Sequence, residues 1–406
     1  MKRLYFFTAA YPYGIGENWK MNELEILSRE FDEINILPLN GRGNLEKKKE
    51  LPKNVFAFKP VFTTPLRFQG FKEIKYLLSK HLYYYLKDFF RNKVFLSQKK
   101  FVKWIMTVKR IQTILKNKDF KKIVRENNEE ALYYFYWGIG LADIIPFLNN
   151  NKHKKVIVRL HGFDLYNEIN DGYIPFRLNL LEHITLALPC SNVGVEYMKS
   201  NYPEYADKFH LQRVGVKKLE IKKNDTYKAN SIVSVSNMVK VKRLDLLIKA
   251  LALCTTDIEW THFGDGLLRK EIEEKCKSLP SNIKVNLRGH IDSSKIIDEL
   301  RIGQFGLFVN VSESEGVPVS IMEAFALGIP ALATDAGGTK EIVDQKVGKL
   351  VPIDISPDNL AKEIKKLLDL QPNEWQKLSE NAYQRYVEEF DLEKWVDQLI
   401  RKMKSI

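Results

Sequence analysis

Short apolar runs alternate with amphipathic stretches along the whole chain. In the first half, six runs rich in β-branched and aromatic residues end at Gly, Pro or Ser. They predict strands at residues 2–9, 34–39, 131–137, 155–161, 185–191 and 210–216. Stretches with helical spacing separate them, including residues 17–31 and a long basic region. Because strands that alternate with helices form parallel βαβ units, this half predicts a doubly wound α/β sheet.

The same alternation restarts after a polar stretch at residues 217–230, which we interpret as a linker. Strands are expected at 231–236, 258–264, 284–289, 305–311, 330–335 and 348–353, and helices at 243–254, 267–279, 294–302, 318–328, 339–344 and 358–369. The chain is helical again from about residue 373. A length of 406 residues exceeds what one core normally supports. We therefore predict domains at 1–216 and 217–385, with a helix at 386–406 that returns to the first domain.

The composition and the cysteines indicate the cellular compartment in which the protein works. Hydrophobic residues make up 45% of the chain and charged residues 28%, as in a globular protein. Cys190, Cys254 and Cys276 have no C-x-x-C spacing, which favours a reducing compartment. The first residues read as a strand rather than a signal peptide, and no run approaches the ~18 apolar residues of a membrane span. The sequence predicts a cytoplasmic protein that is not integral to a membrane.

The net charge of +13 is concentrated in one segment, residues 59–125. This segment holds 18 Lys and Arg against three acidic residues, so the rest of the chain is slightly negative. It also holds 13 aromatic residues. Basic helices with interleaved aromatics are typical of contact with an anionic membrane surface, although a solvated helix face above a core stripe has the same pattern. The cations expected to carry this contact include Lys99, Lys100, Lys103, Lys109 and Arg110.

Residues 310–343, NVSESEGVPVSIMEAFALGIPALATDAGGTKEIV, carry most of the candidate chemistry. A strand leads into a Ser/Glu/Gly loop, Pro318 suits the first turn of the following helix, and Gly328 ends it. Backbone N–H groups of Gly316, Val317 and Val319 would be free to bind a diphosphate. Glu315 precedes the helix and Glu323 lies within it, where a carboxylate can accept from two vicinal hydroxyls. Taken alone, two glutamates at this spacing favour a simpler interpretation, an acid that complements the helix dipole and a solvated helical Glu.

The whole string resembles the E-x7-E segment of family 4 retaining glycosyltransferases, through its Gly-Val-Pro, Glu-Ala, Gly-x-Pro and Gly-Gly elements. The resemblance implies the GT-B fold, two Rossmann-like domains that face a central cleft. It also implies that Glu315 contacts the donor sugar and that Glu323 contacts the nucleotide ribose. The backbone of residues 316–319 would then contact sugar and phosphates.

A second match, IVSVSNMVKVKRLDLLIKAL, begins at Ile232. In the family this region carries an Arg and a Lys that neutralise the donor diphosphate. Lys242 stands at the Lys position, but Asn237 occupies the Arg position, where it can hydrogen-bond a phosphate of the donor but cannot supply the charge. We expect Arg243 or Lys240 to replace it, because cations at a helix N-terminus oppose the helix dipole and need a reason.

Other segments extend the resemblance over nearly the whole chain. Arg288 falls in the segment that borders the nucleotide base in the family. Gly16 falls in a glycine loop near donor and acceptor. His161 and Asp164 follow a predicted strand, where the family often has a His that contacts the donor sugar.

No D-x-D pair occurs in the sequence, so neither a metal site nor a cofactor is expected, and the leaving-group charge falls to Lys242 and Arg243. No residue stands out as a nucleophile. The resemblance implies retention by same-face attack. The expected partners are a UDP- or GDP-sugar donor, a saccharide or lipid-linked acceptor in cell-surface polysaccharide synthesis, and the inner face of the cell membrane.

Two other functions fit parts of the sequence. A sugar-nucleotide epimerase or a phosphorylase can use the same fold. The epimerase would hydrolyse or interconvert its donor without an acceptor, and the phosphorylase would need a lysine in an environment that binds pyridoxal. A nucleic-acid-binding protein would explain the basic aromatic segment, because stacking aromatics in a basic groove hold single strands. It leaves the Glu315 segment unexplained, and we expect no nucleic acid partner.

Overall fold

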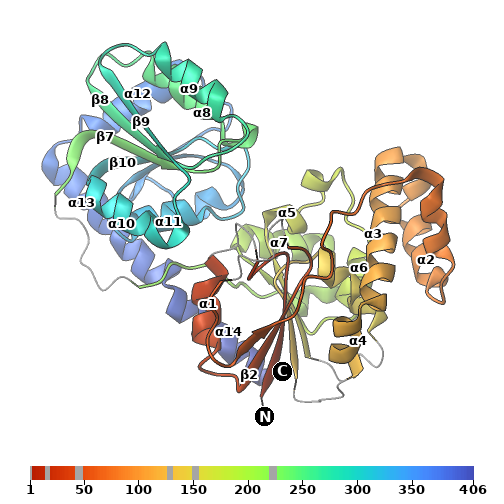
Figure 1. Ribbon diagram of the computed structural model, residues 1–406. Helices are drawn as coiled ribbons and strands as arrows, with labels where there is room; N and C mark the ends of the chain where they lie inside the picture. The colour runs from red at the N-terminus through yellow and green to blue at the C-terminus, as the bar shows by residue number, and fades with distance from the viewer. Residues whose placement is uncertain (1, 14–18, 42–48, 126–130, 149–154, 219–225) are drawn as a thin grey trace. The chain divides into compact units, whose positions relative to one another are not determined.

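The computed structural model describes residues 2–13, 19–41, 49–125, 131–148, 155–218 and 226–406. Its contacts divide the chain into two compact units (Figure 1). The first domain comprises Met1–Gln212 and Val396–Ile406, and the second comprises Arg213–Trp395. Each domain has its own sheet and its own hydrophobic core.

In the described part of the first domain the sheet has six parallel strands in the order β3-β2-β1-β4-β5-β6. Most of their residues are buried, as expected for apolar runs covered on both faces. The strands are β1 (Arg3–Thr8), β2 (Glu33–Pro38), β3 (Val55–Ala57), β4 (Leu132–Phe135), β5 (Lys155–Leu160) and β6 (Leu186–Pro189).

Helices cover both faces of this sheet (Figure 1). The α-helices of the first domain are α1 (Trp19–Leu27), α2 (Leu82–Arg91), α3 (Gln98–Lys116), α4 (Lys118–Arg125), α5 (Gly162–Leu165), α6 (Arg177–Glu182) and α7 (Asn192–Asn201). Shorter 3-10 turns are η1 (Gly70–Leu77), η2 (Val94–Leu96), η3 (Gly140–Phe147), η5 (Glu168–Asn170) and η6 (Pro203–Lys208). The basic segment thus forms η1, α2, η2, α3 and α4, with α2 on the outside of α3 (Figure 1).

The described part of the second domain repeats the plan, with the strand order β12-β11-β10-β7-β8-β9. The strands are β7 (Lys228–Val235), β8 (Ile258–Phe263), β9 (Ile283–Gly289), β10 (Phe305–Asn310), β11 (Ala331–Thr334) and β12 (Gly348–Val351). One face is covered by α8 (Leu244–Leu251), α9 (Arg269–Lys277) and α12 (Pro357–Leu368). The other is covered by α10 (Ser293–Gly303), α11 (Val319–Phe325) and α13 (Pro372–Arg385).

In each sheet the direction in which successive strands are added reverses once, although all the strands are parallel. The first domain places β1 beside β4, and the second places β7 beside β10, so successive strands run outward on either side of these pairs. Loops that leave the carboxyl ends of such a pair diverge and leave a crevice, where open parallel sheets bind ligands. The fold therefore marks the loops after β1, β4, β7 and β10 as sites.

The chain ends on the first domain, as predicted. Helix α14 (Leu392–Ser405) follows a π-helical turn, η9 (Tyr386–Phe390), and its last part belongs to the first domain. There Lys404 Nζ lies 2.7 Å from a carboxylate oxygen of Glu30, and Lys402 Nζ donates to the carbonyl of Leu211 at 2.7 Å. These contacts attach the C-terminal helix to the domain that begins the chain.

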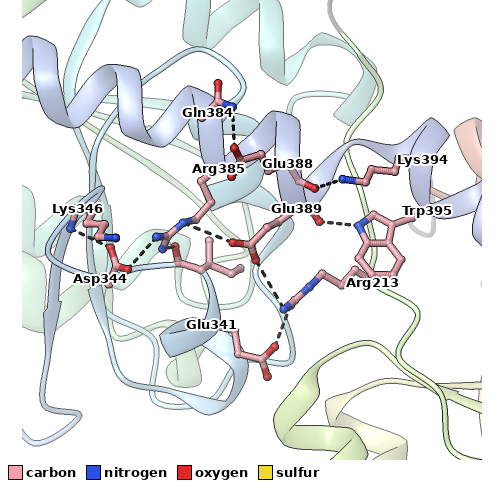
Figure 2. Close-up of polar contacts among 11 residues, drawn as sticks. Arg213, Glu341, Asp344, Lys346, Gln384, Arg385, Glu388, Glu389, Lys394 and Trp395 are labelled. Atoms are coloured by element: carbon pink, nitrogen blue, oxygen red, sulfur yellow. Dashed lines mark hydrogen bonds and ion pairs between the residues drawn. The ribbon is translucent and has the colours of Figure 1, made fainter.

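A charged cluster holds the two ends of the second domain together (Figure 2). Arg213 donates to Glu341 of the 3-10 turn η8 (Gly337–Glu341) at 2.9 Å and lies 3.8 Å from Glu389 of η9. Arg385 pairs with Asp344 at 2.8 Å and also approaches Glu389. The entering segment is thus attached to η8, and the leaving segment is attached to Asp344, just after η8.

Some expected elements were wrong. Residues 210–216 form no strand, because after two hydrogen bonds to β6 the chain turns away toward the second domain. The sixth strand is instead β3, three residues that polar neighbours hide in the sequence pattern. The helix expected at 339–344 is the 3-10 turn η8, whose two glycines favour a tight turn.

Two of the cations expected to contact a membrane are not available for it. Lys109 is buried and pairs with buried Glu73 at 2.8 Å. Arg110 pairs with the buried carboxylate of Asp143 at 2.5 Å. Lys99 and Lys103 lie 3.3 and 3.2 Å from Asp171. The carboxylates of neighbouring elements neutralise this part of α3, a pairing that the linear charge count could not reveal.

Candidate functional site

Two loops meet at the carboxyl ends of β7 and β10. The N–H of Glu313 donates to the carbonyl of Val241 at 2.8 Å, which joins the β10–α11 loop to the 3-10 turn η7 (Lys240–Lys242). Lys242 Nζ lies 2.7 Å from Glu315 Oε1, and Asn310 Nδ2 donates to the same oxygen at 3.2 Å. The sequence motifs around Lys242 and Glu315, 73 residues apart, thus form one site.

The backbone of Gly337 and Gly338 lies against this loop. Gly337 has a φ of +56°, and a Cβ added there would lie 1.9 Å from the carbonyl oxygen of Glu315. The N–H of Gly338 donates to the carbonyl of Gly316 at 2.9 Å. Only glycine permits both the positive φ and the close approach. The Gly-Gly element of the motif therefore supports the shape of the loop.

The backbone N–H groups at the start of α11 remain available. Pro318 is the N-cap residue and stands just before the first helical residue, one position from where the pattern placed it. Among the described residues, no hydrogen bond is formed by the N–H groups of Gly316, Val317 and Val319. The helix ends as predicted, with Gly328 at a φ of +70° and its N–H on the carbonyl of Phe325. Because α11 has only seven residues, its N–H groups count for more than its dipole.

Glu323 is the least satisfied acid of this region. It is half-buried on α11, and no group in the described part of the chain donates a hydrogen bond to its carboxyl. Burial raises the pKa of Glu323 to about 8. A half-buried carboxyl without a protein partner is costly unless a ligand supplies the donors. Glu323 therefore has the properties of a residue that binds hydroxyl groups.

The other predicted residues of the second domain have different surroundings. The guanidinium of Arg243 donates to the carbonyls of Val311 and Ile353 at 2.8 and 2.6 Å, while its Nη2 is buried without a partner. Arg243 thus holds the β10–α11 loop in place. Asn237 is exposed after β7, and Arg288 is exposed on β9 near Glu299 at 3.3 Å.

In the first domain, His161 stands at the carboxyl end of β5. Its ring centroid lies 4.4 Å from that of Trp137 and 5.2 Å from that of Tyr136, and among the described residues neither buried ring nitrogen has a hydrogen-bond partner. Burial, followed by the charges of Arg159 and Lys20, holds the pKa of His161 well below its usual range. His161 is therefore a neutral imidazole with two unused nitrogens, a group that a ligand can hydrogen-bond.

Asp164 has a structural role in the same loop. It is fully buried, and its carboxylate accepts from the N–H groups of Gly138 and His161. Burial raises the pKa of Asp164 to about 6. These contacts connect the ends of β4 and β5, so Asp164 orients the backbone at His161. Gly16 lies outside the described residues.

Sequence reasoning missed a groove in the first domain. A cavity of about 220 Å³ lies at the ends of β1 and β4, and one of about 620 Å³ continues along α3. Arg110, Ile139 and Phe163 line both. The sequence analysis also missed Asn310, the last residue of β10, and Trp137, which follows β4. Their positions at the carboxyl ends of buried strands could have identified them as candidate site residues.

A search of the described residues finds no group of three His, Cys, Asp or Glu side chains arranged to hold a metal ion. Nor does any described helix have the length and apolar character to span a membrane.

Comparison with known families matches residues 216–385 to the glycosyl transferases group 1 model. This range contains the β7 and β10 loops and lies entirely within the second domain. The expected family resemblance is confirmed for the domain that carries Glu315 and Lys242.

Similar proteins include the UDP-N-acetylglucosamine--peptide N-acetylglucosaminyltransferase GtfA subunit of Streptococcus agalactiae, 22% identical over 61% of this chain and 51% of that protein. Another is the Campylobacter jejuni N-acetylgalactosamine-N,N'-diacetylbacillosaminyl-diphospho-undecaprenol 4-alpha-N-acetylgalactosaminyltransferase, 25% identical over 57% of this chain and 68% of that protein. The chain spans about half the length of the first of these relatives.

Among solved structures, HepE from Anabaena in complex with UDP aligns over 100% of both chains with a TM-score of 0.66 and 16% identity. At this identity the alignment shows the fold, which is the predicted GT-B fold.

Proposed function

The chain belongs to the group 1 glycosyl transferases and has the GT-B fold, and on this premise we propose that it is a retaining, metal-independent glycosyltransferase. It moves a sugar from a nucleotide-sugar donor, here taken as a UDP-sugar, to a saccharide or lipid-linked saccharide. The proposal rests on one observation, the set of groups at the switch point of the second domain. The loops there hold the Lys242–Glu315 pair and free backbone N–H groups, and helix α11, which follows, holds the carboxyl of Glu323, without a partner among the described residues.

Each of these groups suits one part of the donor. The carboxylate form of Glu323 accepts hydrogen bonds from the two ribose hydroxyls, which supply the donors that the protein lacks. Lys242 and the N–H groups of Gly316, Val317 and Val319 bind the diphosphate. Glu315 binds hydroxyls of the sugar. Two findings favour UDP as the nucleotide. Three sequence relatives carry UDP-N-acetylglucosamine in their names, and the structural neighbour HepE was solved with UDP bound.

The resting pair of Lys242 and Glu315 has a consequence for binding. Each partner currently holds the other at 2.7 Å. When a diphosphate takes the ammonium group, Glu315 gains acceptor capacity for sugar hydroxyls. The pair thus keeps both side chains extended toward the site before the donor arrives, which reduces the ordering cost of binding.

The reaction breaks the bond between the anomeric carbon and the β-phosphate oxygen and forms a bond to an acceptor hydroxyl oxygen on the same face. The acceptor proton passes to the departing phosphate oxygen, so the products are the glycoside and UDP. Lys242 stabilises the charge that develops on this oxygen. His161, neutral and unpartnered, is assigned to a sugar hydroxyl of the donor.

We assign the acceptor to the groove along α3 in the first domain. Its walls combine apolar residues such as Met106 and Phe163 with the paired cations Lys103 and Arg110. This mixture suits an amphiphilic, lipid-linked saccharide. Together with the positive charge of residues 59–125, it favours work at the inner face of the cell membrane.

A thermal-shift screen over UDP, GDP, ADP and their sugars tests the donor assignment. A ligand at 100 times its dissociation constant stabilises the folded state by about 2.7 kcal/mol. We expect UDP and a UDP-sugar to raise the melting temperature. Stabilisation by none of the nucleotides would contradict the proposal, and conversion of a nucleotide sugar into its epimer without any acceptor would favour the epimerase.

A further inference from the structure

Helix α2 carries large apolar side chains on its solvent side as well as on its buried side. Tyr83, Leu86 and Phe90 are exposed at spacings of three and four residues, whereas Tyr85 and Asp88 are buried. An ordinary surface helix keeps its apolar residues inside and presents polar residues to solvent. The exposed apolar residues of α2 therefore indicate a surface that meets an apolar surrounding.

The apolar surface continues on both sides of α2. Phe71 and Ile74 share one face of the 3-10 turn η1, with Phe71 90% exposed and Leu78 87% exposed. After α2, the exposed residues Phe95 and Leu96 follow on η2. We call this set the apolar ridge: Phe71, Ile74, Leu78, Tyr83, Leu86, Phe90, Phe95 and Leu96.

Charge along the ridge has one sign. Between Phe68 and Phe101 the only two acidic residues are Glu73 and Asp88, and both are buried. Asp88 accepts from Tyr173 and from the N–H of Phe176, and burial raises its pKa to about 6. The exposed ionisable groups between Arg67 and Lys93 are all cations: Arg67, Lys72, Lys75, Lys80, Lys87, Arg91 and Lys93. At the margin of this surface, Lys87 lies 3.8 Å from Glu182.

We propose that the apolar ridge inserts into the interface of an anionic lipid bilayer, with the flanking cations at the headgroups. Large apolar and aromatic side chains surrounded by Lys and Arg are what an interfacial site requires, and the long Lys stems can extend past the ridge to phosphate. A second copy of the chain fits poorly, because it would bring cations against cations. A bilayer supplies both the apolar phase and the opposite charge.

This surface refines the membrane contact of the proposed function. In this proposal η1, α2 and η2 contact the membrane instead of the paired cations of α3, and apolar insertion contributes much of the membrane affinity. It rests on the proposed function only for its purpose, which is to hold a lipid-linked acceptor near the groove. Lipid binding itself can be measured without turnover, so the two proposals fail separately.

Vesicle flotation with the full chain tests the ridge. Wild type should bind phosphatidylglycerol vesicles, bind phosphatidylcholine vesicles weakly, and keep part of its binding at high salt, because salt screens the cations and not the apolar insertion. The triple variant Phe71→Ser, Leu78→Ser, Phe90→Ser should lose about tenfold or more in vesicle affinity. The matched control, Leu253→Ser, Leu267→Ser, Ile302→Ser, replaces three exposed apolar residues of the second domain and should bind as wild type does.

Two further readouts complete the test. Replacement of Lys72, Lys75, Lys80, Lys87, Arg91 and Lys93 by Gln should remove most of the salt dependence. Wild-type binding by the Ser ridge variant would overturn the proposal, and so would absence of wild-type binding at low salt. A dimer that becomes a monomer in the ridge variant, without vesicle binding by either protein, would also overturn it in favour of self-association. UDP binding should be equal in all of these proteins.

Discussion

The loops at the switch point of the second domain and the end of β5 in the first domain both hold candidate ligand-binding groups, but only the first set includes an ion pair and an acid that can ionise. Glu315 and Lys242 form a partly exposed ion pair, and Glu323 is an acid that can ionise when a ligand compensates its burial. His161 is neutral and enclosed by aromatic rings.

The difference indicates a division of tasks. Charge is concentrated where a diphosphate has to be bound and then leave, whereas a neutral hydrogen-bonding group suits a sugar hydroxyl. Neighbouring residues that the fold does satisfy, such as Asp164 and most of Arg243, position the loops instead. Variants of the unsatisfied groups should therefore affect ligands first and stability second.

The largest effect is expected for Lys242→Ala. Loss of a preorganised charge beside the leaving phosphate should cost about 2–4 kcal/mol of transition-state stabilisation. The measurement is turnover with saturating UDP-sugar. Lys270→Ala removes an exposed cation from α9 of the same domain, outside the site, and should have little effect. Turnover of Lys242→Ala within a factor of about two of wild type would reject the assigned role.

Glu323→Ala should weaken UDP binding by roughly 1.5–3 kcal/mol, the range for hydrogen bonds to a charged group. Calorimetric titration measures it. Glu315→Ala should reduce turnover more than UDP affinity, because its proposed partner is the sugar. Equal UDP affinity in wild type and Glu323→Ala would remove Glu323 from the ribose site.

Without ligand, Glu323→Gln should not weaken the protein but should remove part of the pH dependence of its folding stability. Because folding raises the pKa of this acid from 4.5 to about 8, the folded protein binds the proton more tightly. The wild type therefore loses stability as the pH rises from about 4.5 to about 8, by an amount on the order of a few kcal/mol. The Gln variant should lack this decline in a series of denaturant titrations, and an identical pH profile would contradict the raised pKa.

His161→Phe should have a smaller effect. The substitution keeps a ring between Tyr136 and Trp137 and removes both ring nitrogens, so we expect a loss of about 1–2 kcal/mol in sugar transfer. UDP affinity should stay unchanged. His210→Phe, at an exposed histidine of the same domain, serves as the control. Equal loss of UDP affinity and turnover would argue against a contact with the sugar.

The smallest effect is expected from chelation. If Lys242 and backbone N–H groups neutralise the leaving phosphate, EDTA should leave turnover unchanged. Loss of activity with EDTA and recovery with magnesium or manganese would show that a cation shares this task, and would reduce the role of Lys242.

The second domain could be predicted from sequence almost strand by strand, because its apolar runs are uninterrupted and its loops carry residues with specific geometric demands. Gly328 and the Gly337–Gly338 pair behave as their residue types predict. Two separate motifs predicted that Glu315 and Lys242 belong to one donor site, but not that the two side chains pair with each other.

The first domain was harder to predict, because its contacts join residues far apart in sequence. Nothing in the run 210–216 shows that the chain leaves the sheet there. Nor does the linear charge count show that Lys109 and Arg110 hold buried carboxylates, or that Asp88 faces inward while Phe90 faces outward. Local periodicity predicts elements, but it does not assign partners to charges.

The measurement that tests the central claim most directly is the number of protons released when UDP binds at pH 7, from calorimetry in two buffers of different ionisation enthalpy. Glu323, with a pKa of about 8, is mostly protonated in the free protein and must ionise to accept both ribose hydroxyls. We therefore expect wild type to bind UDP saturably with release of protons, and Glu323→Gln to release far fewer. Binding with equal proton release in both proteins, or no UDP binding by wild type, would contradict this expectation.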